Sequence, residues 1–270
     1  MSELKKHFLN LENYSTKWEK YFDVYENLLS KYKNKNIIFI EIGVFNGGSL
    51  NLWKKYFGKN SRIIGIDINK KCKQFEDKEN NIEVFIGNQS DENFWENFFA
   101  KVGKVDVILD DGGHTNLDQI ITTIKTIPHI NDNGLLIVED THTSYLKNYN
   151  SSIKYSFINF TKNIIDNLNS NIDLSLDIKK NNNLNKIIHS IEYFESIAVF
   201  KINRKKSFKN FSVKNTGTFN SIEDLSEHGS EIFIEKIKKF LTKIPLIRLN
   251  KFTKFIKNKV NNKKIKTYFK

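Results

Sequence analysis

Four carboxylates and two histidines occur in two short segments, each of which follows a run of apolar residues. Residues 110–114 (DDGGH) follow Val105–Leu109, and residues 139–142 (EDTH) follow Leu135–Val138. Any one of these carboxylates could cap a helix, but four together would raise one another's pKa values and cost stability unless a cation lay between them. An all-oxygen ligand set with bound water suits a hard ion such as Mg²⁺. His114, three residues beyond an aspartate, is then positioned to act as a general base.

A glycine-containing loop, residues 41–49 (EIGVFNGGS), follows the first apolar run. Glycine lets the backbone approach a ligand closely, and the helix that follows offers unpaired N–H groups. Asp67 ends the next apolar run, and an acidic residue about 20 residues after such a loop suits the ribose hydroxyls of a nucleoside. Phe45 occupies the middle glycine position of G-x-G-x-x-G, which counts against a dinucleotide and favours a cofactor without phosphates. A tight turn and a helix-capping aspartate are the structural alternative.

The elements that carry these segments alternate between strand and helix. The apolar runs are too continuous for half-exposed strands, and helical patterns lie between them, which is typical of a parallel sheet covered on both faces. In such a sheet, ligands bind beyond the carboxyl ends of the strands. We therefore predict an α/β, doubly wound fold. The expected strands are Ile37–Ile42, Arg62–Ile68, Ile82–Ile86, Val105–Leu109 and Leu135–Val138, and the expected helices are Ser49–Phe57, Glu92–Val102 and Leu117–Ile127.

The flanking segments have patterns of their own. Large apolar residues from Tyr14 to Tyr32, Trp18 among them, recur every three or four positions and predict a helix packed on a core. Asn150–Leu168 predicts another amphipathic helix, and two strand-like segments, Ile187–Tyr193 and Ile197–Ile202, predict an antiparallel hairpin at a sheet edge. Lys-rich helical patterns follow from Lys205. We expect a helical cap at 1–33, a cofactor-binding domain at 34–204 and a basic helical extension at 205–270.

The chain has 270 residues and a net charge of +12, and that charge is unevenly distributed. Residues 201–270 hold 19 Lys or Arg and five Asp or Glu, a charge of +14, so the remaining 200 residues are nearly neutral. The single cysteine, Cys72, excludes an intramolecular disulfide, fits a reducing compartment and is expected to be a semi-buried thiol. Residues 1–10 have no apolar region before a cleavage site, and no apolar run approaches 18 residues, so a secreted or membrane-spanning protein is not expected.

These motifs resemble a known family, the class I S-adenosylmethionine-dependent methyltransferases, and within it the metal-dependent sugar O-methyltransferases of macrolide tailoring and of bacterial capsule and lipopolysaccharide loci, with cephalosporin hydroxylase-like proteins as relatives. The resemblance covers roughly residues 14–203 and implies a Rossmann-like fold. The DDGGH and ED motifs are its specific part. The matching segments are TKWEKYFDVYENLL at 16–29, EIGVFNGGSLNLW at 41–53, GIDIN at 65–69, GNQSD at 87–91, LDDGGH at 109–114 and LLIVEDTHTSY at 135–145.

The resemblance implies a role for several residues. Asp67 would bind the ribose hydroxyls, Gln89 or Ser90 would reach the adenine, and His114 would be the catalytic base. Asn88 stands where many relatives have Asp. The role of His142 is left open: it could be a second acid or base, a substrate contact or a residue of the loop. The metal ligands would be Asp111, Glu139 and Asp140, Asp111 would also belong to the catalytic set with His114 and His142, and the cofactor site would further include Glu41, Gly43, Gly47, Ser49 and Asp110.

The reaction expected from the resemblance is methyl transfer from S-adenosyl-L-methionine to a sugar hydroxyl, assisted by a divalent metal, most simply Mg²⁺. The acceptor would be a nucleotide-activated sugar, such as a heptose for capsule or lipopolysaccharide. Alternatives are a methyltransferase for another small hydroxylated or phosphorylated metabolite, an NAD-dependent oxidoreductase, which the missing glycine and the acidic cluster disfavour, and a nucleic-acid-binding protein that uses the basic extension.

The expected location is the cytoplasm. The basic extension could attach peripherally to the inner membrane or pack on the domain with its lysines outward. The sequence leaves the number of subunits open, and we expect a homo-oligomer.

Overall fold

The computed structural model describes residues 2–149, 152–169, 183–207 and 213–218. The chain separates into two compact units, residues 1–212 and 213–270. All the helices and strands described here lie in the first unit. The Lys-rich helices expected from Lys205 onward lie almost entirely outside the described residues.

A seven-stranded sheet forms the centre of the first unit, in the order β3-β2-β1-β4-β5-β7-β6. Strands β1 to β5 are parallel, while β7 is antiparallel to both β5 and β6. Five strands therefore confirm the predicted doubly wound sheet, and the last two confirm the predicted edge hairpin. The strands are β1 (Ile38–Ile42), β2 (Arg62–Asp67), β3 (Ile82–Ile86), β4 (Val105–Asp110), β5 (Ile130–Val138), β6 (Ile188–Phe194) and β7 (Ile197–Ile202).

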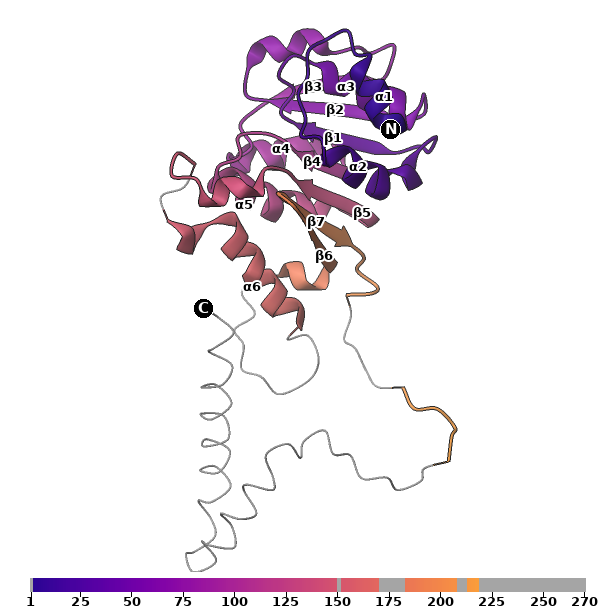
Figure 1. Ribbon diagram of the computed structural model, residues 1–270, viewed down its shortest axis with the longest axis vertical. Coiled ribbons are helices and arrows are strands. Elements are labelled where there is room, and N and C mark those ends of the chain that lie inside the picture. Colours follow the sequence, from indigo (N-terminus) through magenta and orange to yellow (C-terminus); the bar gives the residue numbers. More distant parts are fainter. Residues whose placement is uncertain (1, 150–151, 170–182, 208–212, 219–270) are drawn as a thin grey trace, which may run out of the picture. The chain divides into compact units, whose positions relative to one another are not determined.

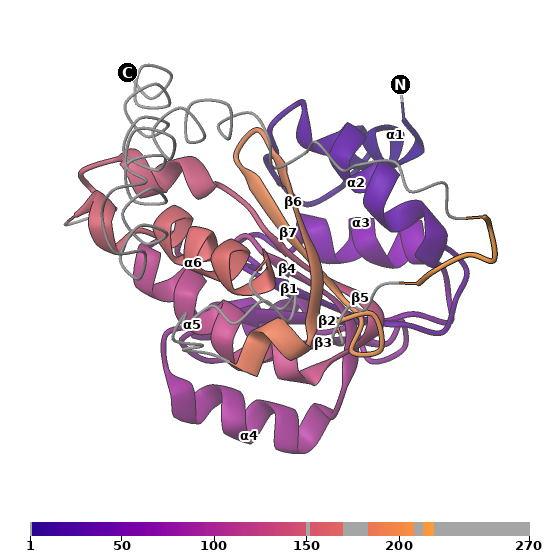
Figure 2. The same cartoon turned by 90° about the horizontal axis from the view of Figure 1, so that it is seen from below.

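Helices cover both faces of this sheet, as Figure 2 shows from below. One apolar core joins the sheet to the first three helices and includes Trp53, and a second core joins the opposite face to the last three and includes Trp95. Both tryptophans are buried. Because an apolar core covers each face of the sheet, both faces of the central strands are buried, and their sequences are continuous apolar runs. The helices are α1 (Glu3–Leu9), α2 (Tyr21–Leu29), α3 (Gly48–Phe57), α4 (Glu92–Val102), α5 (Asn116–Thr126) and α6 (Phe157–Asn169).

The register of the central strands places the motif residues side by side. Ile42 of β1 is opposite Asp110 of β4, which is opposite Val138 of β5. Beyond these positions, the N–H of Asp111 donates to the carbonyl of Ile42 (3.0 Å), and the N–H of Glu139 donates to the carbonyl of Asp110 (2.9 Å). The order in which the chain adds strands to the sheet reverses between β1 and β4. The carboxylates therefore lie at the switch point of the sheet, where ligands bind in this class of fold.

The N-terminal prediction was partly wrong. The expected helix from Tyr14 begins only at Tyr21 and continues after Leu29 as a 3-10 helix, Ser30–Tyr32, while a separate helix forms at Glu3–Leu9. Residues 14–18 form neither helix nor strand. Trp18, expected to pack, is 62 % exposed. Apolar spacing cannot reveal that a segment is held by side-chain contacts to a distant part of the fold.

The helix expected at Asn150–Leu168 is shorter than predicted. A 3-10 helix, Ile153–Tyr155, precedes α6, whose apolar face packs on the second core through Phe157 and Ile164. Among the described residues, no helix is both long and apolar enough to cross a membrane.

Candidate active site

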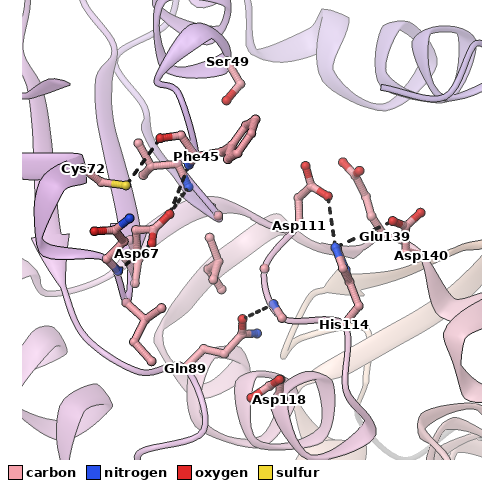
Figure 3. Close-up of a pocket in the computed structure, with 18 of the residues that line it drawn as sticks. Phe45, Ser49, Asp67, Cys72, Gln89, Asp111, His114, Asp118, Glu139 and Asp140 are labelled. Atoms are coloured by element: carbon pink, nitrogen blue, oxygen red, sulfur yellow. Dashed lines mark hydrogen bonds and ion pairs between the residues drawn. The ribbon is translucent and has the colours of Figure 1, made fainter. Parts of the chain in front are cut away.

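A cavity of about 940 Å³ opens at the carboxyl ends of the central strands. Its size is that of sites for small molecules and cofactors. Figure 3 shows two groups of side chains around it, with Asp67 and Cys72 near one end and the acidic residues with His114 at the other. Six segments contribute to its walls: residues 14–18, the glycine loop after β1, the end of β2, and the loops after β3, β4 and β5.

The glycine loop bends over Asp67. The Asp67 carboxylate accepts hydrogen bonds from the N–H groups of Val44 (2.9 Å), Phe45 (3.1 Å) and Asn69 (2.8 Å). A carboxylate has about four acceptor positions, so Asp67 can still accept from a ligand in the cavity that it lines. Its predicted place in the cofactor site is compatible with this geometry.

Gly43 is required by a close approach between two loops. Its φ is +96°, and a Cβ built on it would lie 2.1 Å from the carbonyl oxygen of Asp111. Gly47, which precedes α3, also has a positive φ (+74°) and does not line the cavity. Gly43 thus brings the cofactor loop against the acidic loop, whereas Gly47 lets α3 begin beside Phe75.

Gln89 connects the loop after β3 to the DDGGH segment. Its amide nitrogen donates to Asp110 (2.9 Å) and to Thr122 (3.1 Å), and its oxygen accepts from the N–H of Gly113 (2.8 Å). Asp110 is buried beneath the cavity and is not among the residues that line it, and its place in the cofactor site stays a prediction. Burial raises the pKa of Asp110 to about 6.

Two further residues of the loop after β3 do line the cavity. Asn88 accepts from both the N–H (2.9 Å) and the hydroxyl (2.8 Å) of Ser90 through its side-chain oxygen. This turn is local, so the asparagine at position 88 shapes the loop that was expected to contact the adenine. The side-chain NH₂ group of Asn88 stays available to a ligand.

Asp111, His114 and Asp140 converge on one point. The Nε2 atom of His114 lies 3.8 Å from Oδ1 of Asp111 and 3.7 Å from Oδ2 of Asp140, and all three side chains are half-buried. His114 and Asp140 both have positive φ angles, 55° and 54°, which is uncommon for residues other than glycine and often marks a functional site. One imidazole nitrogen and two carboxylate oxygens could hold a divalent cation here.

The other oxygens of these aspartates have partners within the protein. Oδ2 of Asp111 accepts from the ammonium of Lys17 at 2.5 Å, and Oδ1 of Asp140 accepts from the hydroxyl of Tyr21 at 2.6 Å. Each aspartate is therefore held by one oxygen and presents the other beside His114.

Glu139 has different surroundings from Asp111 and Asp140. It is 1 % exposed, and its two oxygens accept from Lys17 at 3.2 and 3.4 Å, while Oε1 also accepts from Tyr25. Burial raises the pKa of Glu139 well above its usual value, nearby Asp111 adds to this, and Lys17 opposes it. Burial alone would lower the pKa of Lys17, but the carboxylates of Asp111, Glu139 and Glu41 raise it overall.

Glu41 lies behind the cavity wall. Its carboxylate accepts from the hydroxyl of Ser49 (2.6 Å) and the indole of Trp53 (3.0 Å), and it lies 3.7 Å from Lys17. Burial raises the pKa of Glu41. Ser49 lines the cavity and Glu41 does not. Their contacts with the cofactor stay predictions.

His142 lies outside the cavity lining. Its Nδ1 atom is 2.5 Å from the hydroxyl of Ser196, and its ring meets Trp18 edge-on, with 6.4 Å between the ring centroids. Trp18 does line the cavity. The Nδ1 atom of His142 also lies 4.0 Å from Oδ1 of Asp140. Its role as a second acid or base, a substrate contact or a loop residue stays open.

Three residues of the site were not singled out in the sequence. Lys17, Tyr21 and Tyr25 all lie within the segment quoted for the resemblance, but only the spacing of the large apolar residues of that segment was interpreted, as a packing face. One signal was available. The segment belongs to the resemblance and precedes the acidic motifs in the sequence. It carries a lysine and two tyrosines, which can supply a cation and hydroxyl donors to an acidic site.

Comparison with known proteins supports the resemblance. No family model matches the chain. The 8-demethyl-8-alpha-L-rhamnosyl tetracenomycin-C 2'-O-methyltransferase of Streptomyces olivaceus is 29% identical over 173 residues, 59% of this chain and 44% of that protein. The mycinamicin VI 2''-O-methyltransferase of Micromonospora griseorubida is 31% identical over 128 residues, 45% of this chain and 31% of that protein. The chain thus spans less than half the length of these relatives.

Solved structures show the same fold. The MycE methyltransferase of the mycinamycin pathway, in complex with Mg and SAH, superposes with a TM-score of 0.68 at 21% identity, covering 80% of this chain and 58% of that one. Its complex with Mg, SAH and mycinamycin VI gives a TM-score of 0.67 over 80% of this chain and 56% of that one. The Rossmann-like methyltransferase fold and the resemblance to sugar O-methyltransferases are therefore confirmed.

Proposed function

We propose that this chain is an S-adenosylmethionine-dependent O-methyltransferase that acts on a sugar hydroxyl with the assistance of a divalent metal. The observation that carries the proposal is the convergence of Asp111, His114 and Asp140 at one end of a cavity whose other end is formed by the glycine loop and Asp67. The names of the relatives, which act on rhamnosyl and mycinamicin sugars, support the acceptor class, and the MycE complexes with Mg and SAH support the two cofactors.

The residues present fit both cofactors. A free oxygen on each of Asp111 and Asp140 suits Mg²⁺, which binds through one or two carboxylates and keeps waters or substrate oxygens as its other ligands. The glycine at position 43 lets the cofactor loop lie directly against the acidic loop, and Asp67 lines the cavity with acceptor capacity left for a ribose hydroxyl. These residues account for a nucleoside-containing cofactor at one end and a metal at the other.

The reaction needs a nucleophile, and a sugar hydroxyl is a weak one near neutral pH. When bound, the divalent ion would lower the pKa of the acceptor hydroxyl, and S-adenosylmethionine would supply the methyl group. Asp111 and Asp140 fix the position of the acceptor relative to the cavity. His114 then receives the proton of the hydroxyl at Nε2, and the enclosed site holds the reacting groups together, which supplies much of the acceleration.

The finer identity of the acceptor is also a proposal. The relatives' names concern sugars attached to polyketide or macrolide compounds, and they give no support to a nucleotide-activated heptose or to capsule biosynthesis. We favour a hydroxyl of a deoxysugar-type glycoside, and we keep nucleotide-activated sugars as the second acceptor class. Contact of the basic extension with a membrane surface, a homo-oligomeric state and a cytoplasmic location remain predictions.

The direct test is a methyl-transfer assay with the full chain, S-adenosylmethionine and a panel of acceptors that includes rhamnosides and nucleotide-activated heptoses. We expect Mg²⁺-dependent transfer to at least one sugar hydroxyl, abolished by excess EDTA and restored by added Mg²⁺. Full activity in EDTA would exclude the metal-assisted mechanism. Calorimetric binding of SAH but not of NAD is expected as well, and the reverse preference would favour the oxidoreductase alternative.

A further inference from the structure

We propose that Gln89 and Gln119 are positioning residues of the site. The two loops that carry its acidic residues each bend through a left-handed residue, His114 after β4 and Asp140 after β5. In this proposal a buried glutamine side chain bonds the backbone of the residue before each bend, and so sets where the imidazole and the carboxylate point. The inference rests on the proposed function, which assigns these loops to the site, and goes beyond it by naming two residues that act through the loops.

The two bends need support from their surroundings. His114 has a φ of 55° and Asp140 a φ of 54°, and a residue other than glycine keeps such a conformation only where the structure around it holds it there. Their side chains meet at one point, since Nε2 of His114 lies 3.7 Å from Oδ2 of Asp140. A small rotation of either loop would separate two groups that the site needs together.

Gln89 holds the DDGGH loop. Its Oε1 atom accepts from the N–H of Gly113 (2.8 Å), the residue before the first bend (Figure 3). Its Nε2 atom donates to Asp110 (2.9 Å) and Thr122 (3.1 Å), so both donors of the amide are used. The indole of Trp95 donates to the carbonyl of Gln89 (2.8 Å) and fixes the backbone from which the side chain extends. The amide is therefore fixed at both ends and can hold the loop in one conformation.

The fit between Gln89 and this loop is close. A Cβ built on Gly112 would lie 1.9 Å from Oε1 of Gln89, so a side chain at position 112 would push the amide out of its place. The glycine at this position of the motif thus leaves room for a glutamine from another loop. Gln89 also lines the cavity, and its Oε1 keeps one acceptor position, so the expected contact with the adenine is compatible with the positioning role.

Gln119 holds the loop that carries Asp140. It lies on α5 and is 1 % exposed, and its Nε2 atom donates to the carbonyl of Glu139 (2.9 Å), the residue before the second bend. Its Oε1 atom has no hydrogen-bond partner among the residues that the structure describes. A buried acceptor without a partner costs stability, and such groups often belong to functional sites. This cost supports a role for Gln119 in the site and not in the general stability of the fold.

One face of α5 serves both loops. Gln119 and Thr122 are three residues apart on this helix, so they lie on the same face. Thr122 accepts from the amide of Gln89, and Gln119 donates to Glu139. A rigid helix, and not the loops themselves, therefore fixes the positions of the two bends relative to each other.

Amide exchange in the full chain, followed by NMR without any ligand, tests both contacts. Methionine has the length of glutamine, but its thioether cannot donate and is only a weak acceptor. In Q89M the amide of Gly113 should exchange at least about a hundredfold faster than in the original chain. In Q119M the amide of Thr143, which donates to the carbonyl of Asp140 (3.0 Å), should exchange at least about tenfold faster.

Each variant is a control for the other, because neither should change the exchange of the other loop's amide by more than about threefold. T126V controls for altered packing on α5, since the hydroxyl of Thr126 is buried and has no hydrogen-bond partner within the described part of the chain. Unchanged exchange of Gly113 in Q89M, or of Thr143 in Q119M, would overturn the proposal. If Q89M does not fold, the original chain decides, because fast exchange of its Gly113 amide would contradict the bond to Gln89.

Two further measurements connect these contacts to the proposed function. Q89M should lower kcat for methyl transfer about 30- to 100-fold, because an imidazole displaced by about 1 Å is a poorly placed base. Q119M should lower the affinity for Mg²⁺, measured by calorimetry, at least about tenfold, whereas T126V should change neither value. Unchanged kcat in Q89M or unchanged affinity in Q119M would show that the contacts do not position the site. If the original chain neither transfers a methyl group nor binds Mg²⁺, the proposed function fails, while the exchange rates of Gly113 and Thr143 still decide whether the glutamines hold the loops.

Discussion

The ammonium of Lys17 lies 3.2 Å from Oε1 of Glu139, although 122 residues separate them in the sequence. This ion pair joins the N-terminal segment to the end of β5, at the centre of the site. A buried carboxylate that lost its cation would be costly, by about 3–5 kcal/mol for a broken buried pair. The segment between α1 and α2 is therefore part of the site and not an appendage to the fold.

His114 is expected to be essential for turnover. Replacing it by alanine should lower methyl transfer at least a hundredfold, because a positioned general base contributes about 10²–10⁴-fold. SAH affinity, measured by calorimetry, should stay unchanged, since His114 lies at the metal end of the cavity. H189A, which removes an exposed histidine of β6, is the control.

The same variant separates two roles for this imidazole. If His114 acts only as the base, H114A keeps its Mg²⁺ affinity. If Nε2 is a ligand of the ion, as its distances to Asp111 and Asp140 also allow, Mg²⁺ affinity falls together with activity. We expect the first result, and an H114A variant with full activity would contradict both roles.

Asp67 is expected to set cofactor affinity. D67A should weaken SAH binding about 10- to 100-fold, the loss expected for one or two hydrogen bonds to a charged group. E79A removes the same charge from a nearby exposed position outside the cavity lining and should bind SAH normally. Equal affinities of D67A and E79A would exclude Asp67 from the site.

Gly43 and Gly103 offer a matched pair for testing the approach of the two loops. Both have positive φ angles, +96° and +77°, but a Cβ would meet the carbonyl of Asp111 only at Gly43, while nothing lies within 4 Å of it at Gly103. G103A should therefore cost only backbone strain, about 1–3 kcal/mol. G43A should lower Tm by at least about 3 °C more, and should also weaken the binding of SAH. Equal Tm values for the two variants would show that the loops can separate without cost.

Cys72 is expected to react slowly and with a shifted pH dependence. Burial, with a further contribution from Asp67, raises the pKa of its thiol to about 11. A raised pKa keeps the thiol protonated, so at pH 8 the reactive thiolate is about a hundredfold scarcer than for an ordinary thiol. Alkylation with iodoacetamide should keep accelerating above pH 9, whereas in guanidinium chloride it should level off near pH 9. Rapid modification of the folded chain at pH 7 would be inconsistent with this environment.

Much of the fold could be predicted because it depends on local patterns. Continuous apolar runs predicted the five parallel strands, and the bounds of β3 and α4 agree with the structure residue for residue. The alternation of strand and helix also placed Asp67, Asp111, His114 and Asp140 at one edge of the sheet, because successive parallel strands all end on the same side. The resemblance to sugar O-methyltransferases rested on these same motifs.

The tertiary structure decided what each charged group contacts. Nothing in local spacing distinguishes Lys17 from the other lysines of this chain, or shows that Trp18 is exposed while Trp53 and Trp95 are buried. Asp110 and Asp111 are adjacent in sequence, yet Asp110, the last residue of β4, is buried and bonded to Gln89, whereas Asp111, the first residue of the loop that follows, lines the cavity. Local sequence determines where the strands and helices of the central sheet form, whereas the pairing of Lys17 with Glu139 and Asp111 exists only once segments 94 and 122 residues apart are packed together.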